Sequence, residues 1–179
     1  MPPRNEILPN GYRYQTPYGS MVLIEEEDSL SYLNFTETYP YPVKEEETMF
    51  LRQVYRQISE YFEGKRREFT FAIQIKGTPF EQKVYRALQQ IPYGKTKTYQ
   101  EIATIIGSPK ACRAVGRANH QNAILLAIPC HRVIGKNGQL TGFVAGISLK
   151  KKLLSLERGE PECQDYPTCP TSELNSNAS

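Results

Sequence analysis

Residues 128–134 read Ile-Pro-Cys-His-Arg-Val-Ile and carry more information than any other stretch of this 179-residue chain. They place Cys130 beside His131, one of only two histidines, directly after a proline and between apolar residues. A thiol reacts as its thiolate, and neighbouring cationic side chains favour that form. A free cysteine is also among the residues most often buried for packing alone. The stretch therefore predicts either a reactive thiol or a structural cysteine, and the surrounding sequence has to distinguish them.

The composition limits the class of protein. The length fits one domain or two small ones. The longest apolar run, 123–128, is far shorter than the roughly 20 residues of a membrane-spanning helix, and we expect neither a signal peptide nor membrane attachment. Four unevenly spaced cysteines do not form a disulfide framework, which favours a cytoplasmic protein with reduced thiols. The chain has no Cys-x-x-Cys pair and no histidine before His120, so we predict no metal site and no cofactor.

The net charge of +3 is unevenly distributed. Residues 1–75 contain 8 Lys and Arg against 12 Asp and Glu, and residues 76–158 contain 14 against 3. Residues 159–179 contain none against 4. A basic module between two acidic segments indicates a polyanion partner, with nucleic acid first. A merely solvated basic face is the alternative that charge alone leaves open.

The first half alternates in the manner of short strands. Such strands are predicted over 12–15, 19–25 and 30–35, with a helix over about 44–62 and another strand over 69–75. This half shows no catalytic constellation. We therefore expect an α+β fold in which residues 1–76 form a small scaffold domain of antiparallel sheet and helix.

The second half, 77–158, is predicted to be mainly helical. Helices are expected over about 78–90, over 98–107 with a capping box at its start, and over 108–119. The last two fit a helix-turn-helix, although an ordinary helical hairpin is commoner. An extended buried segment over 123–133 and a final helix from about 148, with three lysines at its start, complete this catalytic domain.

Residues 159–179 have no apolar pattern and read as a disordered acidic tail.

Several motifs around the cysteine fit one family. They are Gly77-Thr78-Pro79-Phe80, Ile91-Pro92-Tyr93-Gly94, Thr98-Tyr99, Arg113-Ala114-Val115-Gly116, Asn122, residues 128–134, and Lys152-Leu153-Leu154-Ser155-Leu156-Glu157. This pattern resembles the O6-alkylguanine-DNA alkyltransferases, also called methylated-DNA–protein-cysteine methyltransferases. The close resemblance covers about residues 77–158, and the first half resembles the family only loosely.

The resemblance implies a nucleophile and its activating groups. Cys130 is the expected alkyl acceptor, activated through water by His131 and Glu157. Asn122 is expected to order the loop around the thiol. A base oriented by a third group is the general arrangement for activating a nucleophile. Read alone, Glu157 is equally consistent with an ordinary carboxylate at a helix end, and Asn122 with a turn residue.

The resemblance also implies how DNA is held. Tyr99 is expected to donate a hydrogen bond to the leaving purine and to crowd the DNA backbone, and Arg113 to fill the space left by an extruded base. Arg113 is otherwise a phosphate contact or a solvated charge, and Tyr99 a buried aromatic. Small residues on the helix predicted over 108–119 would let it approach a groove of the DNA closely. They are Ala111, Ala114 and Gly116.

The expected substrate pocket comprises Pro129, Val133, Phe143 and Val144, with main-chain groups near Val133 and Val144 reading the guanine edge. Three residues depart from the usual pattern of the family. Phe143 stands where many members carry tyrosine, Arg117 adds a charge that strengthens phosphate binding, and Cys112 offers a second thiol beside Arg113.

The leading hypothesis is a monomeric DNA-repair protein that acts on double-stranded DNA containing O6-alkylguanine. It flips the base and transfers the alkyl group irreversibly to Cys130, with O4-alkylthymine as a weaker substrate. Two alternatives belong to other classes. One is a non-catalytic alkyltransferase-like lesion binder, but such proteins lack the cysteine, so the presence of Cys130 argues against it. The other is a cysteine hydrolase that uses Cys130 and His131, but a hydrolase would not explain the basic module.

Overall fold

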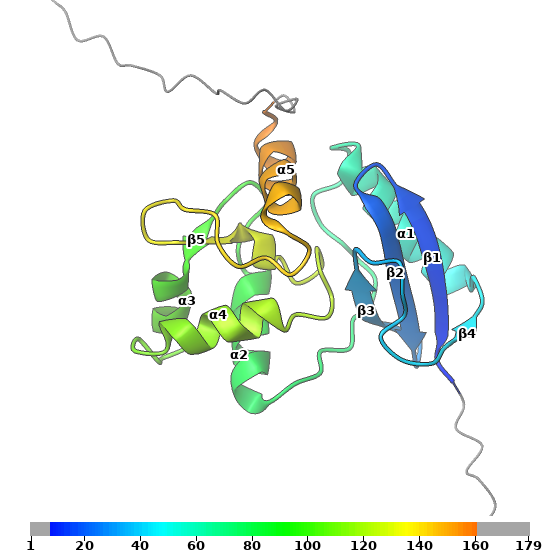
Figure 1. Cartoon of the computed structure of the whole chain (residues 1–179), viewed down its shortest axis with the longest axis horizontal. Helices are drawn as coiled ribbons and strands as arrows, with labels where there is room; N and C mark the ends of the chain where they lie inside the picture. Colours follow the sequence, from blue (N-terminus) through cyan, green and yellow to red (C-terminus); the bar gives the residue numbers. More distant parts are fainter. Residues whose placement is uncertain (1–7, 161–179) are drawn as a thin grey trace, which may run out of the picture.

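The computed structural model describes residues 8–160. A β-rich part and a helical part lie side by side, with α5 beside their junction (Figure 1). The elements of the β-rich part are β1 (Asn10–Thr16), β2 (Gly19–Glu26), β3 (Ser29–Asn34), β4 (Lys44–Glu45) and α1 (Met49–Phe62). Those of the helical part are α2 (Pro79–Gln89), β5 (Lys97–Thr98), α3 (Tyr99–Ile105), α4 (Cys112–His120), the 3-10 helix η1 (Cys130–Arg132), β6 (Val133–Ile134) and α5 (Ile147–Arg158). The α+β fold class predicted from the sequence is confirmed.

The sheet has the strand order β3-β2-β1-β4. The β1–β2 and β2–β3 pairs are antiparallel, as the alternating sequence predicted, whereas β4 runs parallel to β1. Helix α1 packs on one face of the sheet (Figure 1). Its buried residues recur at intervals of three and four, and they are Leu51, Val54, Ile58 and Tyr61.

Two predictions for the β-rich part were wrong in detail. Helix α1 begins at Met49 and not near Lys44, because Thr48 caps it by accepting from the Leu51 amide at 3.1 Å. The residues before the cap pair instead with β1. The strand expected over 69–75 is reduced to an isolated bridge between Ile73 and Leu30 of β3. The same strand also bridges to Ile124 through Leu33, so the two segments share it.

The helical part begins with two capped helices. Thr78 and Thr98 each form a capping box with the glutamate three residues later, at the starts of α2 and α3. Helix α4 begins at Cys112, later than the expected Ser108, because residues 108–111 form a turn closed by a 2.8 Å bond from the Ala111 amide to the Ser108 carbonyl. Helices α3 and α4 contact each other.

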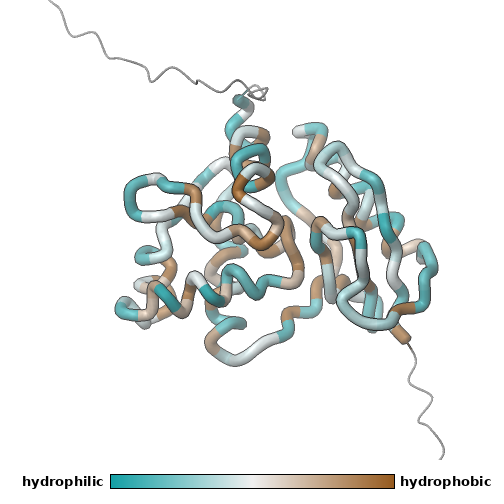
Figure 2. Tube along the Cα trace, in the orientation of Figure 1, coloured by the Kyte–Doolittle hydropathy of each residue, from teal (hydrophilic) through white to brown (hydrophobic). Residues whose placement is uncertain are grey.

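The segment expected to be extended over 123–133 is buried but not extended. It makes successive turns, with Leu126 at a φ of 68°, and then enters η1. This hydrophobic segment runs beside the sheet, where Ile124 forms a bridge to Leu33 (Figure 2). The following strand β6 pairs in parallel with β5, which the sequence did not predict. This pairing brings the residues after Cys130 alongside the start of α3.

Buried apolar residues of both parts form one continuous core that includes Leu33, Tyr61, Leu88, Leu125 and Leu153. The two parts therefore hold each other in place rather than being joined only by the chain. The expected acidic tail, 159–179, lies outside the described residues apart from Gly159 and Glu160.

Candidate active site

Cys130 begins η1, directly after Pro129, and its side chain is buried. Burial raises the pKa of the Cys130 thiol to about 11, although a hydrogen bond from Asn122 and the charge of Lys150 act in the opposite direction. In the free protein the group is therefore a thiol at neutral pH. Reaction as a thiolate requires a base to take its proton.

Asn122 connects the thiol to the preceding loop. Its Nδ2 donates to the Cys130 sulfur at 3.1 Å and to the Ile128 carbonyl at 2.8 Å, while its Oδ1 accepts from the Ile124 amide at 3.0 Å. Both ends of the amide are thus engaged, as the expectation of a loop-ordering residue requires. Asn119 adds a 3.3 Å bond from its Nδ2 to the Cys130 carbonyl. No sequence signal had singled out Asn119.

His131 and Glu157 lie together in the interior, joined at 2.7 Å between Nε2 and Oε1. Burial lowers the pKa of His131 below its usual value, although Glu157 opposes this. Burial acts to raise the pKa of Glu157, but His131 and Arg132 outweigh it and lower this pKa to about 2. The pair is therefore a neutral imidazole and a carboxylate.

The hydrogen bonds determine the tautomer of His131. An ionised carboxylate has only acceptor atoms, so Nε2 must carry the proton and donate it to Glu157. The other ring nitrogen, Nδ1, then carries a lone pair. It is buried and has no hydrogen-bond partner within the described part of the chain. His131 can thus accept a proton at Nδ1.

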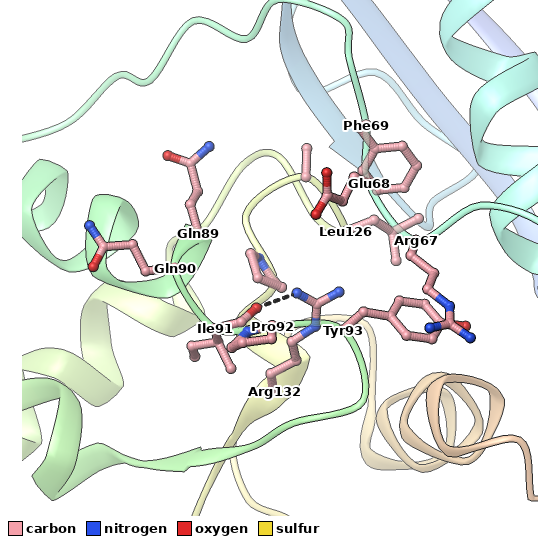
Figure 3. Close-up of a pocket in the computed structure, with 12 residues that line it drawn as sticks. Arg67, Glu68, Phe69, Gln89, Gln90, Ile91, Pro92, Tyr93, Leu126 and Arg132 are labelled. Atoms are coloured by element: carbon pink, nitrogen blue, oxygen red, sulfur yellow. Dashed lines mark hydrogen bonds between the residues drawn. The ribbon is translucent and has the colours of Figure 1, made fainter.

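Arg132 does not face the thiol, although its place two residues after Cys130 had suggested that it promotes the thiolate. Its Nε and Nη2 donate to Glu157 at 2.9 Å each, and its Nη1 donates to the Ile91 carbonyl at 2.6 Å. The guanidinium also lies over the ring of Tyr93, beside a cavity of about 400 Å³ (Figure 3). Arg132 therefore holds the carboxylate rather than the nucleophile.

Two more donors reach Glu157 from positions that sequence reasoning missed. The Tyr61 hydroxyl donates to Oε1 at 2.7 Å, and the Gly94 amide donates to Oε2 at 3.0 Å. Glu157 is therefore part of a buried polar network and not a simple helix-end carboxylate. The helical spacing of α1 had left either Tyr61 or Phe62 as the inward-facing residue, and nothing local indicated the partner of Tyr61.

Phe143, Val133 and Pro129 are buried near the site, whereas Val144 is 37% exposed. The ring of Phe143 meets that of His131 edge to face, with centroids 6.5 Å apart. Phe143 thus places an apolar ring against the imidazole of His131.

Lys150 is one of the three lysines predicted at the start of the last helix, and its burial was not foreseen from the sequence. Its side chain is fully buried, and its ammonium donates to the Val133 carbonyl at 2.6 Å and to the Thr141 carbonyl at 2.8 Å. The Tyr99 hydroxyl donates to the same Thr141 carbonyl at 3.1 Å. Thr141 therefore joins α3, the loop over 135–146 and α5.

Helix α4 presents its charged residues to solvent. Arg113, Arg117 and Ala114 are exposed, and Ala111 and Gly116 are half-buried. Four of these residues therefore lie on one accessible helix, and Ala111 is the residue that precedes its first turn. Tyr99 lies beside this helix, since a Cβ added at Gly116 would be 3.8 Å from its ring.

Cys112 is not a freely accessible second thiol. It is half-buried, and its sulfur donates to Gln100 Oε1 at 2.8 Å.

Within residues 8–160, no group of three or more His, Cys, Asp or Glu side chains is placed to hold a metal ion. Over the same residues, no helix has the length and apolar character needed to cross a membrane.

Two family models match this chain. The 6-O-methylguanine DNA methyltransferase ribonuclease-like domain matches residues 12–75, and the DNA binding domain of the same family matches residues 79–159.

Curated relatives match over most of their length. The methylated-DNA–protein-cysteine methyltransferase of Methanosarcina acetivorans is 45% identical over 150 residues, covering 80% of this chain and 95% of the relative. The constitutive enzyme of that name from Bacillus subtilis is 43% identical over 152 residues, covering 80% and 92%.

The fold agrees with solved structures. Mycobacterium tuberculosis OGT in complex with DNA superposes with a TM-score of 0.81 at 39% identity, covering 86% of this chain and 96% of that one. The same organism's O6-methylguanine methyltransferase superposes with a TM-score of 0.79 at 37% identity, covering 88% and 97%. With both family models, the curated relatives and the fold in agreement, this chain belongs to the methylated-DNA–protein-cysteine methyltransferase family.

Proposed function

We propose that this protein repairs DNA by transferring methyl and larger alkyl groups from O6 of guanine to Cys130. O4-alkylthymine is a weaker substrate. The observation that carries the assignment of roles is the buried His131, whose Nε2 is held by Glu157 and whose Nδ1 is free to accept a proton. A buried thiol with a raised pKa requires such a base.

The reaction begins with transfer of the thiol proton of Cys130, through a water molecule, to Nδ1 of His131. The Glu157 carboxylate stabilises the imidazolium that results. The thiolate then attacks the alkyl carbon and forms a C–S bond while the C–O6 bond breaks. The electron pair of that bond passes to the purine, which takes up a proton and remains in the strand as guanine.

The departing purine needs a proton or a hydrogen bond, and the proposal assigns this role to the hydroxyl of Tyr99. In the free protein its hydroxyl donates to the Thr141 carbonyl, so it must exchange this partner for the substrate. Phe143 contributes apolar contact only, because it lacks a hydroxyl. The main-chain groups around Val133 and Val144 read the edge of the guanine.

The product is a thioether at Cys130. Breaking its C–S bond again would require a second nucleophile, and the proposed mechanism provides none. Each molecule therefore acts once, and the transfer is stoichiometric and irreversible.

Helices α3 and α4 act as a helix-turn-helix on the DNA, with α4 in a groove. Arg113 fills the stack after the alkylated base has been flipped out, and Arg117 contacts phosphate. The small residues Ala111, Ala114 and Gly116 allow the close approach. Guanine O6 is inaccessible inside the duplex, so the chemistry requires extrusion of the base.

The proposal divides the chain into a scaffold over 1–76 and a catalytic domain over 77–158. The two family matches, which end at residue 75 and begin at residue 79, support this division. The protein acts as a monomer in the cytoplasm, without a cofactor.

The test is incubation with a duplex that carries radiolabelled O6-methylguanine. One label per protein molecule on Cys130 is the expected result. Cys130→Ala must bind the duplex without taking up label, while Cys112→Ala, which alters the other described thiol, must react like the wild type. Binding without transfer by the wild-type protein would favour the lesion-binding alternative, and label on Cys112 would overturn the assignment of the nucleophile.

A further inference from the structure

Tyr61 belongs to the part of the chain that was expected to serve only as a scaffold. It lies in the last turn of α1, and its side chain is 1% exposed. Its hydroxyl oxygen is 2.7 Å from Glu157 Oε1 and 3.5 Å from His131 Nε2. The β-rich part thus contributes a polar group that reaches the centre of the catalytic network.

The direction of this hydrogen bond follows from its partner. Glu157 is ionised and can only accept, so the phenol must donate. Burial and the nearby carboxylate raise the pKa of Tyr61 well above its usual value, which keeps the donor proton in place. Oε1 of Glu157 therefore receives hydrogen bonds from Tyr61, His131 and Arg132 at once.

Three donors share the negative charge of one oxygen. Each additional donor stabilises the carboxylate, so the carboxylate stabilises a protonated His131 less. The pKa of His131 is lower as a result. We propose that Tyr61 is a positioning residue of the N-terminal part that sets the basicity of His131 by hydrogen bonding to Glu157. This inference rests on the proposed function, in which His131 takes the proton of Cys130.

The other charged and titratable groups around His131 are known. Helix α5 contributes Glu157 and Lys150 and η1 contributes Arg132 and Cys130, while Tyr93, in the loop after α2, faces Tyr61. Replacing any of the three charged groups changes the net charge of the site. Tyr61→Phe removes one hydrogen-bond donor and leaves every charge in place, so a change in its pH profile reports the hydrogen bond itself.

The substitution is conservative in packing. The Tyr61 ring contacts the rings of Phe62, Phe69 and Tyr93 with centroids 5.5–5.9 Å apart, and phenylalanine retains these contacts. Glu157 remains paired with His131, Arg132 and the Gly94 amide, so no buried charge is left without a partner.

Tyr14→Phe is the matched control. Tyr14 is also a buried tyrosine of the β-rich part, and its hydroxyl donates to a carboxylate, that of Glu47, at 3.0 Å. None of its ring or hydrogen-bond contacts involves the catalytic network. It therefore reports the general cost of losing a tyrosine–carboxylate bond in this half.

The experiment measures single-turnover alkylation by the free base O6-benzylguanine as a function of pH, which avoids any effect on DNA binding. In wild type the rate falls at low pH as His131 becomes protonated. Tyr61→Phe is expected to move this acid limb to higher pH, with rates on the limb about threefold lower and the plateau nearly unchanged, since half a pKa unit corresponds to about threefold. Tyr14→Phe is expected to follow the wild-type profile.

A second substitution predicts the opposite sign. Site-specific incorporation of difluorotyrosine at position 61 keeps the hydroxyl and makes it a stronger donor, so the acid limb must move to lower pH. This arm tests the inference even if Tyr61→Phe does not fold.

An NMR titration provides a direct readout, because the chain has only two histidines and His120 on α4 is exposed. The titration of His131 is expected to shift to higher pH in Tyr61→Phe.

Equal slowing at every pH, or identical profiles for all variants, would overturn the role of Tyr61. Failure of the wild type to become alkylated on Cys130 would instead refute the proposed function.

Discussion

The side-chain amide of Asn122 donates to the Cys130 sulfur at 3.1 Å, and the same nitrogen donates to the Ile128 carbonyl at 2.8 Å. One residue thus holds both the reactive atom and the turn that presents it. An alkyl group on the sulfur needs space beside this amide. Alkylation of Cys130 therefore acts directly on the bonds that order residues 122–130.

Asn122→Ala removes three hydrogen bonds at once, including the one that the Ile124 amide donates to Oδ1. We expect it to lower the free energy of unfolding by about 2–4 kcal/mol, because the Ile124 amide loses its partner and the Ile128 carbonyl keeps only its bond from the Cys130 amide. Asn119→Ala, which removes one bond to the Cys130 carbonyl, is the control and should cost about 1 kcal/mol. Urea unfolding measures both values, and equal costs would show that Asn122 has no special role.

The stability of the fold should decrease in acid because of His131 and Glu157. Both have a pKa below the usual value in the folded state, so the unfolded chain binds more protons. The contribution of His131 is lost as the pH falls below about 6.5. That of Glu157 is present above its unfolded pKa of about 4.5 and disappears as the pH falls towards 2.

Glu157→Gln tests the second contribution. The wild type is expected to lose up to about 3 kcal/mol between pH 4.5 and 2 through this carboxylate. The variant should be less stable at neutral pH, where Arg132 lacks its partner, but its stability should depend less on pH in that window. Urea midpoints across the acid range provide the measurement. Parallel curves for the two proteins would show that other carboxylates dominate.

Lys150→Met is expected to impair the pocket while preserving apolar packing. The Val133 and Thr141 carbonyls lose their shared donor, which frees the loop over 135–146 that carries Phe143. We expect the rate with free O6-benzylguanine to fall at least tenfold. Lys151→Met removes the same charge from the neighbouring exposed position and should leave this rate unchanged. Equal effects of the two substitutions would contradict a specific role for Lys150.

The sequence predicted much of the fold, and the proposal of Cys130 as the nucleophile came from the sequence as well. An N-cap at Thr78 followed by Pro79, and a capping box at Thr98, predicted the starts of two helices within a residue, because these signals are local. The segment around Leu126 was harder, since its turns are stabilised by burial and by Asn122 rather than by turn residues. Local patterns do not encode such tertiary compensation.

Sequence reasoning missed Lys150 and Tyr61 for different reasons. Lys150 lies three, four and seven residues before Leu153, Leu154 and Glu157, so helical periodicity already placed it on the buried face. The contact of Tyr61 with Glu157 spans 96 residues and joins the two parts of the chain. Only the packing of α1 against the helical part brings these two side chains together.

The last prediction concerns Arg113, which is exposed on α4. If it fills the stack after base extrusion, Arg113→Ala should slow single-turnover repair of a saturating duplex about tenfold or more while sparing the free base, since a flipping cost of a few kcal/mol is then no longer offset.

Arg117→Ala removes the same charge one turn later on the helix. It should weaken duplex binding and reduce the dependence of log affinity on log salt by about one unit, with little change in the saturated rate. Equal slowing of duplex and free base by Arg113→Ala would indicate support of the pocket, and a saturated duplex rate equal to wild type would reduce Arg113 to a phosphate contact. The difference between the two arginines is expected because Arg113 lies in the first turn of α4, next to Ala114, whereas Arg117 lies in the last turn.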